Sequence, residues 1–134
     1  METAKKGYSA YILTESSRTD LLKYFPPQFT KVIAHHVTYQ FPDNQAPPLH
    51  HLIEVIGYSI TSGADSVDEH SIECVVVQVA GTHRRPDGQI FHITLSLMPQ
   101  TTRPVHSNTL LKRKGWKPIP QPFTLEVEPQ WISF

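Results

Sequence analysis

Six short runs rich in β-branched and aromatic residues, separated by turn-forming residues, place the strongest constraint on the fold of this chain. The runs are Tyr8–Leu13, Val32–Phe41, Leu52–Ile60, Ile72–Ala80, Gln89–Leu97 and Phe123–Val127. This composition between Gly and Pro breaks is typical of β-strands. Residues 61–70 have loop composition, and Pro86-Asp87-Gly88 predicts a hairpin turn.

Two segments instead have a helical pattern, at residues 14–25 and 107–114. Ser17 and Asp20 resemble a capping box, and Ser107 is the expected N-cap of the second helix. Gly115 is expected to end that helix. Together the runs and helices predict an α+β fold with mostly antiparallel sheets and two short helices outside them.

Length and charge limit the class of protein. The 134 residues fit a single domain over 1–134, and 12 basic and 12 acidic residues give a formal net charge of zero. A neutral chain argues against wrapping duplex DNA, which needs a strongly basic face. The chain contains no apolar run of about 18 residues that could span a membrane, and its polar start lacks a signal-peptide pattern. We therefore expect a soluble cytoplasmic protein, a monomer with no membrane partner.

Histidine is unusually frequent, with eight residues, and two of the predicted strands repeat one pattern around it. HVTY begins at His36 and HITL begins at His92, each reading His-apolar-Thr-apolar. Residues i and i+2 of a strand point to the same face. His36 therefore projects with Thr38, and His92 with Thr94. If the two strands lie side by side, two imidazoles and two hydroxyls line one groove.

The same alternation assigns the rest of each strand. The polar faces continue to Gln40 in the first strand and to Ser96 in the second. Val37, Tyr39 and Phe41 are expected to point the other way, into the core.

This groove would suit cleavage of a phosphodiester. The reaction needs a base for the nucleophile and an acid for the leaving oxygen, and two imidazoles can supply both. Threonine hydroxyls can donate to the phosphoryl oxygens. The chemistry requires no metal and no cofactor.

The paired HVTY and HITL resemble the duplicated HxTx motif of the two-histidine (2H) phosphoesterase superfamily. That family includes RNA 2′,3′-cyclic phosphodiesterases and the cyclic phosphodiesterase domain of tRNA ligases, and the order of elements around the motifs is similar. The resemblance implies a bilobal fold in which each lobe contributes one HxTx strand to a central cleft. It also implies metal-independent chemistry, with His36 and His92 catalytic and Thr38 and Thr94 binding phosphate. The chain is short for the family, which leaves little room for insertions that read a nucleobase.

The expected function is hydrolysis of a small nucleotide or RNA-end phosphodiester, with a 2′,3′-cyclic phosphate as the leading substrate. One alternative is a phosphodiesterase that degrades cyclic di- or oligonucleotide second messengers, as viral or bacterial proteins could. A second is a nucleotide or RNA-end binding module without catalysis. A third alternative is a histidine-rich metal-binding protein. Activity that survives EDTA, with no metal found by elemental analysis, would eliminate this alternative.

Two further residues are expected at the cleft. Tyr11 stands central in its strand and is the candidate to stack on a base, while Tyr8 falls on the opposite face. Arg85 follows His83 and Arg84 before the hairpin turn. It is expected to clamp phosphate at the cleft mouth, with an exposed hairpin tip as the alternative.

Other polar residues are expected to be structural. His35 should pack on the strand face opposite His36, unless a bulge reverses the two faces. His50 and His51 are expected to be solvated, with a metal site as the weaker alternative. Asn108 is expected to cap a helix, and Cys74 to be inert in the core.

Overall fold

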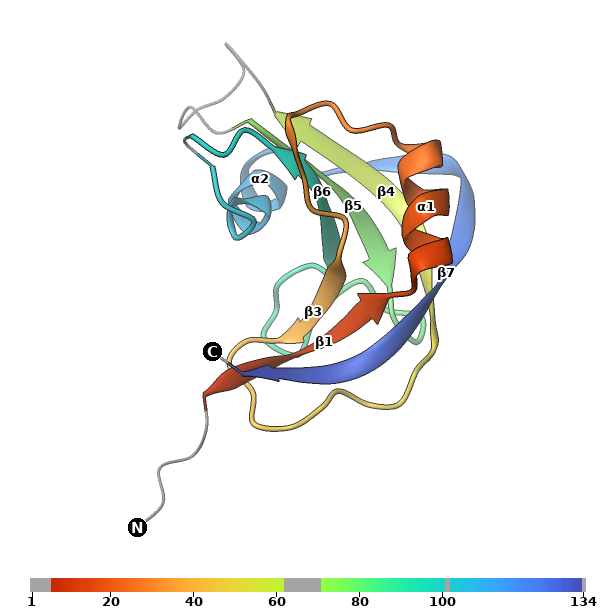
Figure 1. The fold of residues 1–134 in the computed structure, drawn as a ribbon, viewed down its shortest axis with the longest axis vertical. Coiled ribbons are helices and arrows are strands. Elements are labelled where there is room, and N and C mark those ends of the chain that lie inside the picture. Colours follow the sequence, from red (N-terminus) through yellow and green to blue (C-terminus); the bar gives the residue numbers. More distant parts are fainter. Residues whose placement is uncertain (1–5, 62–70, 101, 134) are drawn as a thin grey trace.

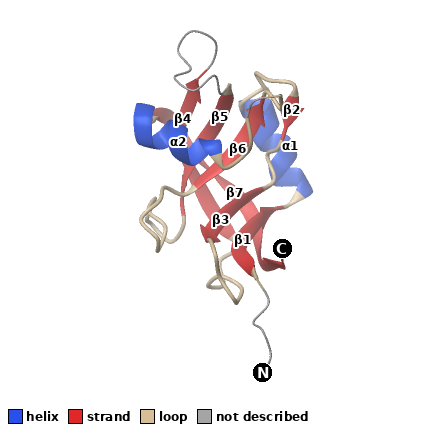
Figure 2. Cartoon of the chain, turned by 90° about the vertical axis from the view of Figure 1, so that its left-hand side faces the viewer, coloured by secondary structure: helices blue, strands red, loops and turns tan. Residues whose placement is uncertain are grey.

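The computed structural model describes residues 6–61, 71–100 and 102–133, and within them the chain forms seven strands and two helices. The elements are β1 (Gly7–Leu13), α1 (Glu15–Tyr24), β2 (Lys31–Val32), β3 (His36–Gln40), β4 (Leu52–Thr61), β5 (Ile72–Gln78), β6 (His92–Leu97), α2 (His106–Lys114) and β7 (Lys117–Ser133). All neighbouring strands pair antiparallel in one open sheet, in the order β2-β6-β5-β4-β7-β1-β3. The expected α+β class with antiparallel strands is confirmed. Figure 2 shows the strands in red, with the two helices packed beside them in blue.

Two apolar clusters lie on opposite faces of β5 and explain where the helices sit. Val75 belongs to the larger cluster, which also takes Leu21 of α1. Cys74 belongs to the other cluster, which takes Leu110 of α2. Since neighbouring strand residues point to opposite faces, α1 and α2 cover the two sides of the sheet (Figure 1). The thiol of Cys74 is fully buried, as expected.

The predicted strand Val32–Phe41 is in fact two strands that belong to opposite ends of the sheet. β2 pairs with β6, and the backbone N–H of Ala34 continues this pairing to Thr94 at 2.8 Å. From His35 onward the chain pairs with β1 instead. The switch occurs at Ala34, which has a positive φ of 41° and is fully buried. One segment thus joins both ends of the sheet, and β3 comes into contact with β6 without pairing to it.

A bulge in β6 corrects the expected face of Ser96. Thr94 lies opposite Cys74, but Ser96 lies opposite Glu73, so the register shifts between the two pairs. Ser96 is therefore turned away from Thr94, to the face where its hydroxyl donates to the buried Glu73 carboxylate. Tyr58 donates a second hydrogen bond to that carboxylate at 2.6 Å. The polar face of the motif ends at Thr94.

The last strand is much longer than the predicted Phe123–Val127. β7 continues through Pro118, Pro120 and Pro122 and pairs first with β4 and then with β1. Proline lacks the N–H that a strand ladder uses. Here the prolines lie where the register to β4 shifts, between Pro118 and Phe123, so few hydrogen bonds are lost.

The helix ends differ from the sequence-based expectation at their N-termini. Thr14 caps α1, because its hydroxyl accepts from the backbone N–H of Ser17 at 3.2 Å. The second helix begins at His106, one residue before Ser107, and lacks a side-chain cap. Gly115 ends α2 with a φ of 70°, as predicted.

Two other expectations concern the loops and the membrane. The predicted loop over residues 61–70 lies almost wholly outside the described residues. The predicted turn is present, since Gly88 donates its N–H to the carbonyl of Arg85 at 3.0 Å. Within the described ranges no helix has the length and apolar character needed to cross a bilayer.

Candidate active site

A cleft of about 470 Å³ brings the four motif residues together. His36 and Thr38 line it from β3, and His92 and Thr94 line it from β6. The two strands are not neighbours in the sheet. The cleft forms between them, next to the point at Ala34 where the chain stops pairing with β6 and begins to pair with β1. The juxtaposition expected from the repeated pattern is therefore present.

The alternation of side chains along β3 and β6 makes these four residues face the cleft. In β3, Val37 pairs with Tyr11 and both are buried in the larger apolar cluster, so His36 and Thr38 face away from it. In β6, Ile93 points into the same cluster, and His92 takes the opposite face. The apolar residues of each motif thus anchor the strand, and the polar ones face the cleft.

His92 is held in a single tautomer. Its Nδ1 lies 2.8 Å from the carbonyl oxygen of Ile90. A carbonyl only accepts, so Nδ1 carries the proton and Nε2 of the neutral ring carries a lone pair. Burial lowers the pKa of His92 to about 4. The nearby Arg85 acts in the same direction, and the hydrogen bond to Ile90 opposes it.

His36 is also held through Nδ1, which lies 3.0 Å from Nδ1 of His35. Burial is the main cause that lowers the pKa of His36 to about 4, and charge repulsion from His35 and then His92 contributes to the same shift. His92 is therefore close enough to influence the ionisation of His36. Both are neutral at pH 7 in the free protein.

The expectation that His35 is packed is wrong. Its side chain is exposed, and its ring meets that of His36 edge-on, with centroids 5.2 Å apart. The left-handed backbone at Ala34 breaks the regular strand just before His35. Simple alternation therefore does not apply between these two neighbours.

The two threonines of the motifs are not equivalent. The hydroxyl of Thr94 lies 2.8 Å from that of Ser107 and 3.3 Å from the carbonyl of Pro104, and the residue is 6% exposed. Within the described part of the chain, the side-chain hydroxyl of Thr38 has no hydrogen-bond partner. Thr38 therefore has a donor free for a ligand, whereas Thr94 is already held by α2 and the loop before it.

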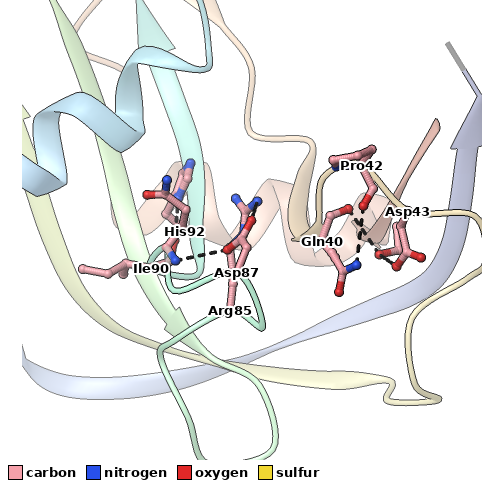
Figure 3. A network of polar contacts seen from close by, with 9 residues as sticks. Gln40, Pro42, Asp43, Arg85, Asp87, Ile90 and His92 are labelled. Atoms are coloured by element: carbon pink, nitrogen blue, oxygen red, sulfur yellow. Dashed lines mark hydrogen bonds and ion pairs between the residues drawn. The ribbon is translucent and has the colours of Figure 1, made fainter. Parts of the chain in front are cut away.

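Arg85 lies in the wall of the cleft and not at an exposed hairpin tip. Its side chain is buried, and its Nη2 donates to Asp87 at 2.6 Å. The buried Nε has no partner among the described residues. Figure 3 shows Arg85 and Asp87 beside His92. The placement of Arg85 at the cleft agrees with the expectation, and its role in binding phosphate stays a prediction.

The aromatic residues at the cleft are not the expected ones. Tyr11 is fully buried in the core, and its hydroxyl donates to the carbonyl of Pro48 at 2.6 Å. Tyr8 lines the cleft instead, with its ring centroid 5.8 Å from that of His36. Phe41 also lines the cleft, 52% exposed, although the strand pattern placed it in the core. The central position of Tyr11 in β1 places its side chain in the core and not in the cleft.

Asn108 was missed from the sequence. It lines the cleft from the first turn of α2, and its buried Oδ1 has no partner among the described residues. The only sequence signal was its position shortly after the second motif. By contrast, His50 and His51 are not among the cleft residues, and His51 lies 3.5 Å from Glu128 on the surface. In the described ranges, no three His, Cys, Asp or Glu side chains are grouped so that they could hold a metal ion.

The cleft thus combines groups that move protons with groups that bind an anion. His36 and His92 are neutral imidazoles with fixed Nδ1 contacts, Thr38 offers a free hydroxyl, and Arg85 supplies a buried positive charge. Comparisons with protein-family models, curated proteins and solved structures find no match to this chain. The side chains that line the cleft are therefore the observations that bear on function.

Proposed function

We propose that this protein is a hydrolase that cleaves a phosphodiester in a small nucleotide or at an RNA end, with a 2′,3′-cyclic phosphate as the favoured substrate. The observation that carries the proposal is the meeting of both His-apolar-Thr-apolar repeats in one cleft, from strands that do not pair. The apolar residues of both motifs already pack in the core, so the polar side chains that line the cleft are available to a ligand. The resemblance to 2H phosphoesterases supports the same reading, with the two ends of the sheet standing for the two lobes.

The hydrogen bonds of the imidazoles support one assignment of their roles in this reaction. His92 presents the lone pair of Nε2, because Ile90 holds its proton on Nδ1. His92 is therefore the base that takes a proton from water as the new P–O bond forms. His36 is the acid that protonates the ribose oxygen as its bond to phosphorus breaks.

The remaining cleft groups would bind the phosphate anion. Thr38 can donate to a phosphoryl oxygen without breaking an existing hydrogen bond. Arg85 carries a positive charge in the cleft wall, partly balanced by Asp87. Preorganised donors stabilise the negative charge on the phosphoryl oxygens without the reorganisation that water molecules would need. Tyr8 and Phe41 would lie against the base or ribose.

The test is a substrate panel with the purified full chain. It contains 2′,3′-cyclic mononucleotides, RNA oligonucleotides ending in a cyclic phosphate, and cyclic di- and oligonucleotides, each with and without EDTA. We expect hydrolysis of the cyclic phosphates that EDTA does not abolish. His36→Ala and His92→Ala should each lower turnover by about 10²–10⁴-fold, and His51→Ala is the surface control.

Other outcomes of the substrate panel would support a different function. Cleavage of the cyclic di- or oligonucleotides alone would make second messengers the substrate. Binding without cleavage of any member would indicate a nucleotide-binding module. Full activity in either cleft variant would reject the assigned pair of histidines.

A further inference from the structure

We propose that the exposed His35 is a proton relay that supplies the proton which His36 delivers to the leaving oxygen. This inference rests on the proposed function and adds a third histidine to it. It starts from the 3.0 Å contact between Nδ1 of His35 and Nδ1 of His36. Two nitrogens at this distance share one proton, so one ring donates and the other accepts.

The direction of that hydrogen bond decides what His36 can do. If His36 donates from Nδ1, its neutral ring offers only a lone pair at Nε2. If His35 donates, the neutral ring of His36 carries its proton on Nε2 and can act as an acid. Because Ile90 restricts neutral His92 to the role of base, the reaction needs His36 as acid and hence His35 as donor.

Burial explains why the proton must come through a second ring. A positive charge on His36 inside the cleft is costly, since it loses the solvation of water and lies near His92. His35 is exposed, so water can solvate a charge there. In the proposed relay the pair therefore carries its positive charge on the solvated ring of His35, and His36 stays neutral.

The proton transfers balance within this pair. As the leaving oxygen takes the Nε2 proton of His36, the Nδ1 proton of His35 moves to Nδ1 of His36, and both rings end neutral. His92 meanwhile holds the proton taken from water. Its release to solvent, and the uptake of one proton by the His35–His36 pair, restore the starting state.

The backbone keeps the two rings in contact. The N–H of Leu13 donates to the carbonyl of His35 at 3.0 Å, and Nε of Arg18 donates to the carbonyl of Ala34 at 3.1 Å. Together with the positive φ of Ala34, these bonds fix the turn that brings neighbouring side chains together. The titratable groups that act on His36 are His35 and His92, and the ring of Tyr8 lies nearby.

A pair of substrates separates a relay from a merely structural role. His35→Ala should lower kcat/KM at least tenfold on a 2′,3′-cyclic nucleotide, whose ribose oxygen must be protonated as it leaves. The same variant should lose less than twofold on a p-nitrophenyl phosphodiester, whose leaving group needs no proton. Imidazole in the buffer should restore the cyclic substrate's rate, because the site is open to solvent. His51→Ala is the control. Equal losses on both substrates, no rescue, or full activity would overturn the relay.

A measurement without turnover keeps the relay separate from the proposed function. In the wild-type chain with ¹⁵N-labelled histidine, an N–H···N bond produces a scalar coupling between the two Nδ1 nuclei. We expect this coupling between His35 and His36. Its absence would overturn the relay even in an active enzyme. A wild type that shows the coupling and cleaves no phosphodiester would instead overturn the proposed function.

Discussion

The ionisation of His36 and His92 provides the most direct test at the scale of single residues. Burial lowers the pKa of each to about 4. A phosphate anion between the rings would favour their charged forms and raise at least one pKa. We therefore expect NMR titrations of the free protein to show two histidines that protonate far below pH 6, and inorganic phosphate to move one of them upward.

The control for this titration is sodium chloride at the same ionic strength, which should leave both values unchanged. Identical titration curves with phosphate and with chloride would contradict an anion site between His36 and His92.

Thr38 and Thr94 should respond differently to the same substitution. Thr38→Val removes a hydroxyl that has no side-chain hydrogen-bond partner among the described residues, so we expect weaker substrate binding, with a KM about tenfold higher, and unchanged stability. Thr94→Val also removes a hydrogen-bond partner of the fully buried Ser107 hydroxyl, which costs about 1–3 kcal/mol of unfolding free energy. Steady-state kinetics and urea unfolding measure the two effects. Equal destabilisation by both substitutions would show that Thr38 has a structural partner.

What the sequence could reveal about the site was limited to side chains that follow a regular period. The pattern identified His36, Thr38, His92 and Thr94, because alternation holds within each short strand. It failed at His35, where one buried residue with positive φ interrupts the strand. Asn108 and Tyr8 line the cleft through tertiary packing, and no local pattern records that.

Among the secondary-structure elements, the segment that includes β2 and β3 determines whether a cleft exists. Ala34 is fully buried with a φ of 41°, a conformation that β-branched residues rarely adopt. We expect Ala34→Val to destabilise the fold by about 2–4 kcal/mol, through strain and overpacking, and to lower activity as well. Urea unfolding and steady-state kinetics measure both.

Two further substitutions separate the causes of this loss. Ala80 also has a positive φ, 51°, but is exposed, so Ala80→Val shows the strain without the overpacking. Ala34→Gly removes the strain and should leave stability near that of the wild type. A harmless Ala34→Val would mean that the strand switch does not depend on this residue.

The elements themselves were predictable where β-branched and other apolar residues are concentrated between turn-forming segments, as in β4, β5 and β6. β7 was underestimated because its prolines read as a linker, although they fall where pairing to β4 is already irregular. The division between β2 and β3 escaped prediction because nothing in VIAHHVTYQF interrupts its strand propensity. The change of partner depends on where β6 and β1 lie, which is a property of the whole sheet.

For the molecule as a whole, the central fact is that the two ends of one open sheet are linked by ten residues, 31–40. Sequence patterns predicted antiparallel strands, but strand order depends on contacts between distant segments. Because the cleft lies between β3 and β6, its shape depends on how the two ends of the sheet are held together by this segment. Substitutions that loosen the sheet should therefore damage the site as well.

The lowered pKa values of His36 and His92 make the stability of the fold depend on pH. The unfolded histidines have a pKa of about 6.5, whereas His36 and His92 have values of about 4 in the folded protein. Between these pH values the unfolded state binds more protons, so acid favours unfolding. The free energy of unfolding should be highest above pH 6.5 and fall by at most about 1.4 kcal/mol per pH unit for each histidine as the pH drops toward 4.

The comparison of variants isolates this contribution from that of the carboxylates, which titrate in every form of the protein. His36→Asn and His92→Asn each remove one half-buried titrating group, so their unfolding free energies should fall less steeply with acid than that of the wild type. His51→Asn changes an exposed histidine and should follow the wild-type curve. Denaturant unfolding from pH 4 to pH 8 measures the slopes. Parallel curves for all four proteins would mean that the cleft histidines are as solvated in the folded state as in the unfolded chain. The proposed acid–base pair of half-buried histidines would then have no physical basis.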